Sequence, residues 1–149
     1  MAVGIYLAAL SGSLMSQDGN YTKPFAITFD GRIGGFKETK LYIRNDDPTY
    51  YYTNLELAFQ DLSDENIVTN QGEGFSWKLI EGNSKPTLND WKNTPAGNTL
   101  SFASGLGSLG SPDIATYLPF WIFIEVPPGL DIQVFRDVKF LLSGNEVLV

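Results

Sequence analysis

Apolar and polar residues alternate along several short stretches of the chain, which is the pattern of β-strands with one buried face. Residues 25–29 and 55–60 alternate strictly, and residues 40–44 and 75–80 follow the same pattern less regularly. Gly, Pro, Asn or Asp bounds most of these stretches, and these residues favour turns. The pattern therefore predicts short strands joined by tight turns.

Further strands are expected towards both ends of the chain. Residues 4–10 are apolar and predict a first strand, and residues 1–20 can either pair within the chain's own sheet or act as an arm that docks on a neighbour's sheet edge. Residues 132–142 predict a final strand pair or one bulged strand. Residues 104–113, with three glycines, predict a pliable surface loop. A short turn near residues 88–91 is expected to bury Trp91.

The stretch 120–126 is apolar on both faces apart from Glu125, and Pro127-Pro128-Gly129 ends it. Such a strand is either covered on both sides or has one face in the core and the other against a partner. A carboxylate in this setting needs an explanation, because buried carboxylates are normally paired. We expect Glu125 at an outward edge position, or in a salt bridge to Arg136 or Lys139.

Taken together, about seven to nine short strands predict an all-β fold, an antiparallel β-sandwich of immunoglobulin-like or jelly-roll-like type. The chain has 149 residues, of which 43% are hydrophobic, enough for one core without metal or disulfide support. We expect one domain over residues 1–149, with residues 1–20 as its first strand or docking arm.

The chain contains no cysteine and no histidine. Their absence excludes disulfides, thiolate and imidazole metal sites, and nucleophilic catalysis that depends on a Ser-His or Cys-His pair. The sequence therefore predicts a protein that is not an enzyme and has no cofactor.

Two carboxylate chemistries remain open. A glycosidase pair could be drawn from Glu56, Glu73, Glu81 and Glu125, but their separation does not follow from sequence. The acidic residues at 46–47 and at 61, 64 and 65 lack the spacing of a calcium loop. We expect solvated loops there and no metal.

The formal net charge is −7, and the ten basic residues are scattered along the chain. Nucleic acid and anionic membrane surfaces both attract clustered cations, so neither is expected as a partner. No basic residue precedes the apolar stretch near the start, which argues against a secretory signal. No apolar run reaches the ~20 residues of a membrane-spanning helix.

Three consecutive tyrosines, Tyr50, Tyr51 and Tyr52, stand beside Asp46 and Asp47. Tyrosine offers a large rigid surface and a hydroxyl, so these rings could bind a protein partner or stack on a sugar. Strict alternation gives another interpretation, in which Tyr51 faces the core and its two neighbours point outward. Candidate interface residues are Ile5, Tyr6, Leu7, Tyr50 and Tyr52.

Three segments resemble small virion proteins of tailed bacteriophages: TFDGRIGGFKETKLYIRNDDPTYYYTNLELAF, WKLIEGNSKPTLNDW, and YLPFWIFIEVPPG followed by DVKFLL. The resemblance covers most of the chain from Phe25 onward and has no counterpart for residues 1–20. It implies a β-sandwich of the tail, neck or capsid surface. This step is an analogy at the level of the fold.

Two functions are consistent with these observations. The leading hypothesis is a non-enzymatic structural component of a tailed-phage virion, in the tail, neck, baseplate or capsid decoration. It would act by protein–protein contacts with other virion proteins and with copies of itself in a symmetric assembly. The alternative is a carbohydrate-binding module for host-surface glycans, with Tyr50, Trp77 or Trp91 as stacking platforms.

Overall fold

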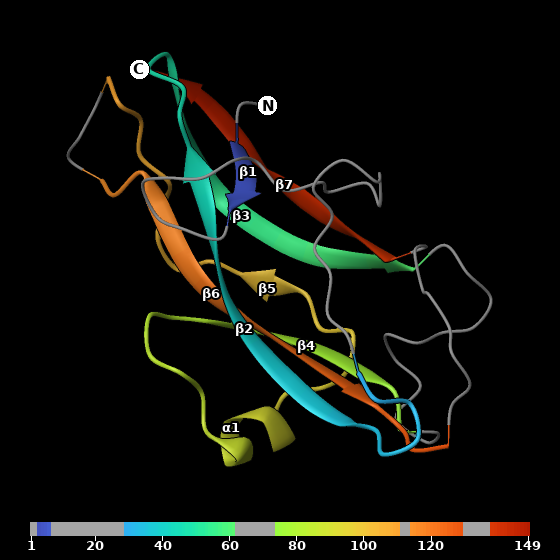
Figure 1. Ribbon diagram of the computed structural model, residues 1–149. Helices are drawn as coiled ribbons and strands as arrows, with labels where there is room; N and C mark the ends of the chain where they lie inside the picture. Colours follow the sequence, from blue (N-terminus) through green and yellow to red (C-terminus); the bar gives the residue numbers. More distant parts are fainter. Residues whose placement is uncertain (1–2, 7–28, 62–73, 111–113, 130–137) are drawn as a thin grey trace.

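The computed structural model describes residues 3–6, 29–61, 74–110, 114–129 and 138–149. Within these ranges the chain forms strands and one short helix (Figure 1). In chain order the elements are β1 (Val3–Tyr6), β2 (Gly35–Asn45), β3 (Tyr50–Asp61), β4 (Ser76–Glu81), α1 (Leu88–Lys92), β5 (Leu100–Ser101), β6 (Tyr117–Val126) and β7 (Val138–Leu148).

These strands make two sheets in which all the pairs are antiparallel. One sheet has four strands in the order β1-β2-β6-β4, and the other has three in the order β5-β3-β7. In Figure 1 the three-stranded sheet lies behind the upper part of the four-stranded sheet. The predicted all-β sandwich-like fold is confirmed.

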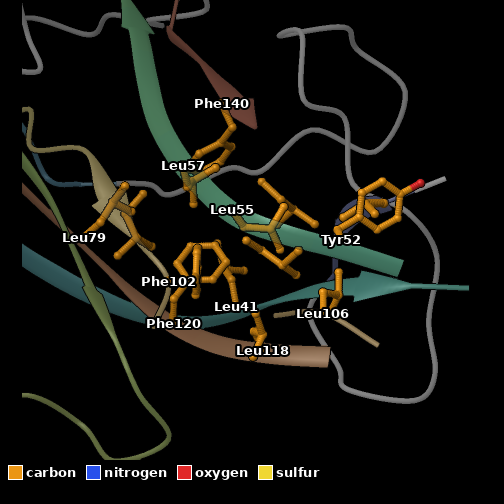
Figure 2. Packing of buried hydrophobic residues seen from close by; sticks show 14 of the residues in the cluster. Leu41, Tyr52, Leu55, Leu57, Leu79, Phe102, Leu106, Leu118, Phe120 and Phe140 are labelled. Carbon is orange, nitrogen blue, oxygen red and sulfur yellow. The ribbon is translucent and has the colours of Figure 1, made fainter. Parts of the chain in front are cut away.

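The core lies between the sheets and is built from alternate residues of the long strands (Figure 2). Its fully buried members include Leu41 and Ile43 of β2, Phe120 and Ile122 of β6, and Leu55 and Leu57 of β3. Burying one such side chain contributes about 1.5–3 kcal/mol. Alternation in the sequence therefore translates directly into one apolar face on each sheet.

The apolar stretch 120–126 lies in β6, which pairs with β2 on one side and β4 on the other. Its expected central position is therefore confirmed. The expected edge position of Glu125 is wrong, because this residue lies opposite both Phe36 and Ser76. Arg136 and the side chain of Lys139 lie outside the described part of the structure.

The tyrosine triplet has the opposite orientation from that predicted by strict alternation. Tyr52 is fully buried and its hydroxyl donates a hydrogen bond of 2.8 Å to Glu146 Oε1. Tyr51 lies on the opposite face of β3, away from the core. The cause is a β-bulge between Thr53 and Glu56, where Asn54 adopts φ +52°. One extra residue in the strand inverts which side chains face the core.

The predicted surface loop at 104–113 is wrong at its centre, because Leu106 and Ser108 are fully buried, whereas Ser104, Leu109 and Gly110 are exposed as expected. Leu106 and Tyr52 exchange two backbone hydrogen bonds of 2.9 Å. The Ser108 hydroxyl donates to the Asp47 carbonyl at 2.6 Å. Gly107 lies so close to Ile114 that an added Cβ would be 2.1 Å from its carbonyl oxygen. The glycines permit close packing here.

The prediction that Trp91 is buried by a short local element is confirmed. Thr87 and Asp90 form a capping box at the start of α1, in which each side chain accepts a hydrogen bond from the other residue's backbone N–H. The bond from the Thr87 N–H lowers the pKa of Asp90. This cap begins a helix of only five residues, whose Trp91 is 1% exposed.

Candidate functional site

The five predicted interface residues do not form one exposed surface. Ile5 and Tyr52 are fully buried in the core, so the prediction that they meet a partner is corrected. Tyr6 is also buried at 8% exposure, and Tyr50 is half-buried. Leu7 lies outside the described residues.

β1 pairs with the end of β2 in the chain's own sheet. Its register places Val3 opposite Asn45 and Tyr6 opposite Tyr42. Residues 3–6 therefore form a first strand of the sandwich, which was one of the two alternatives. The remainder of the expected arm, at 1–2 and 7–20, lies outside the described residues.

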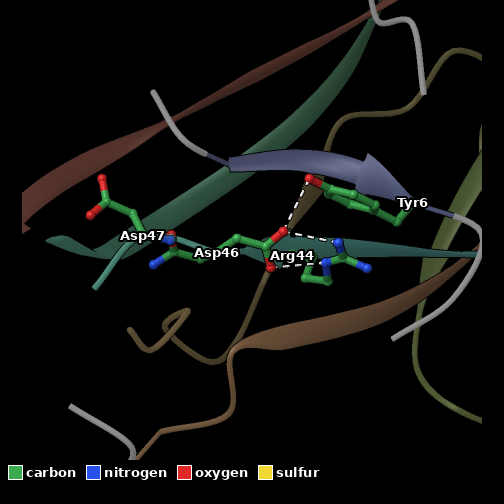
Figure 3. Close-up of polar contacts among 5 residues, drawn as sticks. Tyr6, Arg44, Asp46 and Asp47 are labelled. Atoms are coloured by element: carbon green, nitrogen blue, oxygen red, sulfur yellow. Dashed lines mark hydrogen bonds and ion pairs between the residues drawn. The ribbon is translucent and has the colours of Figure 1, made fainter. Parts of the chain in front are cut away.

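Three side chains fasten β1 to β2 on the outer face of the four-stranded sheet (Figure 3). The Arg44 guanidinium lies 3.5 Å from the ring centroid of Tyr6 and forms two hydrogen bonds, of 3.0 and 2.9 Å, to the Asp46 carboxylate. The Tyr6 hydroxyl also donates to Asp46, at 3.3 Å. Burial, together with the Asp46 charge, raises the pKa of Tyr6, and the hydrogen bonds to Asp46 raise the pKa of Arg44.

The same outer face carries an unusual number of aromatic side chains. Alternation with the core residues places Phe36 and Tyr42 of β2 and Tyr117, Trp121 and Phe123 of β6 on this face. Tyr42 and Tyr117 meet edge to face with ring centroids 6.1 Å apart, and Phe36 stacks on Phe123 at 5.3 Å. A solvated sheet face is normally polar, so these rings require either a cover or a ligand.

Helix α1 supplies the cover at one end of this face (Figure 1). The Trp91 ring lies 5.2 Å from Phe123, and its Nε1 donates to Glu38 Oε1 at 2.9 Å. Lys85 pairs with the same carboxylate at 3.0 Å, while the buried Lys78 donates to the Trp91 carbonyl at 2.8 Å. A small second core therefore exists outside the sandwich.

Beyond α1 the face is partly open. Tyr42, Tyr117, Pro119 and Trp121 are all half-buried. We call these four residues, with Lys40 of the same face, the aromatic face. Lys40 lies directly opposite Trp121 in the β2–β6 register. Sequence reasoning passed over Trp121, because an apolar strand looks like core throughout until its neighbours are known.

Of the three expected stacking platforms, Trp91 is buried, whereas Tyr50 and Trp77 are half-buried. Trp91 is buried under α1, and Trp77 packs edge to face against Phe59 with ring centroids 5.6 Å apart, beside the core. The expectation that Trp91 stacks on a sugar is therefore wrong, since this residue is 1% exposed.

Three of the four candidate carboxylates, Glu56, Glu81 and Glu125, lie among the described residues. Glu56 accepts a long hydrogen bond from Ser101 in the three-stranded sheet, and Glu81 accepts one from the Ala103 N–H. Glu125 lies on β6, and Glu73 is outside the described residues. No group of three or more potential metal ligands occurs in the part of the chain that the structure describes.

Aliphatic side chains are exposed at the end of the sandwich where β2 turns into β3. Leu109, Ile114, Leu148 and Val149 are 42–65% exposed, and we call these four residues the apolar end. Hydrogen bonds hold their segments together: Val149 N–H donates to the Thr49 carbonyl at 2.8 Å and Gly107 N–H to the Ala115 carbonyl at 2.8 Å. Figure 1 shows the C-terminus beside the β2–β3 turn.

The described residues contain no helix with the length and apolarity needed to cross a membrane. Searches against protein-family models, curated proteins and solved structures each gave no match to this chain.

Proposed function

We propose that this protein is a non-enzymatic structural subunit of a tailed-bacteriophage virion that acts through protein–protein contacts. The observation that carries the proposal is the apolar end, where four of the seven exposed large aliphatic residues described by the structure lie on segments held together by backbone hydrogen bonds. The other three, Ile33, Leu88 and Leu141, lie in a turn, in α1 and in β7 respectively. The resemblance of the chain from Phe25 onward to virion proteins supports a location of the protein in the virion. The partners are neighbouring virion proteins and further copies of the chain.

The chemistry of the apolar end suits protein contact. Its side chains are branched and aliphatic, so they gain by leaving water but offer no hydrogen bond to a polar ligand. Tyr50, which lies opposite Leu148 in the β3–β7 register, borders this end and is the one predicted interface residue that remains available there. Contiguous exposed apolar surface of this kind marks interaction sites.

The size of the apolar end favours repeated rather than isolated contacts. Burying the remaining half of each side chain would contribute about 1 kcal/mol, or about 4 kcal/mol in total. Association costs at least about 4 kcal/mol in lost freedom. A single contact of this size does not hold two free subunits, whereas many equivalent contacts in a symmetric particle do.

The test uses charge at exposed positions. We expect the double variant Leu109→Glu/Leu148→Glu to fold normally and to be lost from virions in infected cells, because burying two carboxylates at a contact is costly. Leu88→Glu is the matched control, since Leu88 is 58% exposed on α1. Particle incorporation is measured by quantitative mass spectrometry of purified virions.

Two results would contradict the proposal. One is a wild-type chain that stays free in the lysate while complete particles assemble without it. The other is a double variant that enters particles as well as wild type and Leu88→Glu do.

A further inference from the structure

We infer that β7 pairs with β7 of a second copy of this chain, in antiparallel orientation, and so joins the three-stranded sheets of the two copies into one continuous sheet. The inference deepens the proposed function and rests on its claim that copies of the chain contact one another. Sheet edges carry backbone N–H and C=O groups that can pair with another chain, and the edges of the two sheets differ in how far the chain itself covers them.

The four-stranded sheet offers little edge for pairing. β1 at one edge has only four residues. At the other edge, beside β4, the Gly97 N–H donates to the Trp77 carbonyl at 2.7 Å, and the Asn98 side chain bonds both the N–H and the carbonyl of Leu79, at 2.8 and 2.9 Å. In the three-stranded sheet, β5 has two residues, whereas β7 has 11 and forms the opposite edge (Figure 1).

Alternate backbone groups of β7 point away from β3. Glu146 lies opposite Tyr52 in the β3–β7 register, and Tyr52 uses its N–H and carbonyl on the other side of β3, where it exchanges hydrogen bonds with Leu106. The pair is therefore of the non-hydrogen-bonded kind, so the N–H and carbonyl of Glu146 point outward. Those of Gly144 and Leu148, two positions away, point outward as well. Among the described strands none lies beyond β7.

β7 also lacks the devices that usually protect a sheet edge. Residues 140–149 contain no lysine, arginine or proline, and these are the residues that keep natural edges from pairing. Glu146 is the only charged side chain there, and it is bonded to β3. Leu141, Leu148 and Val149 are 51–65% exposed. Both the backbone and the side chains of this edge therefore favour a further strand.

The sequence of β7 is complementary to itself in one register. A two-fold axis that passes through Asn145 normal to the sheet keeps inner face beside inner face, and each residue meets the one equally far beyond Asn145 in the second copy. The pairs are Leu141 with Val149, Leu142 with Leu148, Ser143 with Val147, and Gly144 with Glu146. The three exposed aliphatic residues thus all gain an aliphatic partner. An axis at Gly144 would instead place Leu142 against Glu146.

This register predicts which engineered cysteines form a disulfide between copies, and the chain has no cysteine of its own. Asn145 would face its counterpart in a non-hydrogen-bonded pair with Cα atoms about 4.5 Å apart, which is within disulfide range. We expect Asn145→Cys to give a crosslinked dimer on non-reducing gels after mild oxidation. Ser143→Cys is the matched control, exposed on the same face but about 13 Å from its counterpart, and should not crosslink.

Association of the chain without a crosslink is measured by sedimentation velocity over a range of concentrations. We expect a monomer–dimer equilibrium, because the backbone hydrogen bonds of the paired strands add to the contact between aliphatic side chains. Asn145→Lys places two like charges opposite each other and should weaken the dimer about fivefold at low salt, less at high salt. Ser143→Lys should weaken it less. Circular dichroism checks that both variants fold.

A chain that stays monomeric at every concentration overturns the inference, as does equal crosslinking of the two cysteine variants. A monomer in which the amides of Gly144 and Glu146 resist hydrogen exchange would assign the edge to another segment of the same chain. Failure of the proposed function gives a different result. A dimer that is absent from virions contradicts the virion role alone, and a monomer that enters virions contradicts the β7 pairing alone.

Discussion

The outer faces of the two sheets differ in the side chains that they present to solvent. On the three-stranded sheet, the face opposite the core carries mainly small or polar residues: Tyr51, Thr53, Glu56 and Ala58 of β3, and Leu141, Ser143, Asn145 and Val147 of β7. On the four-stranded sheet, the corresponding face carries five aromatic residues on β2 and β6. The first face follows the expected amphipathic pattern, and the second departs from it.

The aromatic residues on this face fall into two groups, those that α1 covers and those that it leaves partly open. Phe123 is 6% exposed because Trp91 of α1 covers it, so fold stability accounts for the aromatic character at that end. Tyr42, Tyr117 and Trp121 are not covered to the same degree. The cover by α1 therefore does not account for the aromatic character of these three residues.

The largest expected effect on stability comes from removing the Trp91 side chain, which covers Phe123. Trp91→Ala should destabilise the protein by about 3–5 kcal/mol, as expected for a large buried aromatic residue. Tyr51→Ala on the other outer face should cost less than about 1 kcal/mol, the value of a cross-strand pair. Urea denaturation measures both. Similar losses would mean that the two faces do not differ in the way the structure indicates.

The next largest effect is expected at Glu38, a carboxylate on the outer face of the four-stranded sheet. The Glu38 side chain is 6% exposed and accepts the Trp91 indole hydrogen bond, so Glu38→Ala should cost about 1–3 kcal/mol by leaving a buried donor unpaired. Glu56→Ala is the matched control on the three-stranded sheet, where the carboxylate is exposed, and should change stability by less than about 0.5 kcal/mol. Equal effects would argue against a second core under α1.

A third prediction concerns the residue that decides which tyrosine faces outward on the three-stranded sheet. Asn54→Ala should cost about 1–2 kcal/mol, because the left-handed conformation at φ +52° penalises a side chain with a Cβ and no compensating local hydrogen bond. Asn54→Gly removes this penalty and should match or exceed wild-type stability. Thermal unfolding compares the three proteins, and an Ala variant as stable as Gly would contradict a conformational origin.

This bulge also shows where sequence reasoning stopped. Alternation at Leu55, Leu57 and Phe59 correctly predicted the inner face of β3, but extending it back through Asn54 placed Tyr51 in the core. A bulge leaves little signal in a polar stretch, since Asn is also common in turns. The strands and the sandwich follow from local periodicity, which tolerates such an error.

The composition of the aromatic face depends on information that no local pattern contains. Lys40 and Trp121 are far apart in the sequence and become neighbours through the β2–β6 register. The apolar stretch 120–126 predicted a strand that is either covered on both sides or has a partner on its second face. Which residues would share that face could not be predicted, because the pairing of distant strands sets it.

The smallest expected effect tests the fastening of β1 at the other end of the aromatic face. Tyr6→Phe removes the 3.3 Å hydrogen bond to Asp46 but keeps the ring against Arg44, so the loss at pH 7 should be below about 1 kcal/mol. Because the pKa of Tyr6 is raised in the folded state, its contribution is fully present below the unfolded pKa of about 10 and is lost as pH rises through the folded value. Wild type should therefore lose stability relative to Tyr6→Phe between pH 9 and 11 in urea titrations. A difference independent of pH over this range would show that the hydroxyl is as hydrated in the folded chain as in the unfolded one.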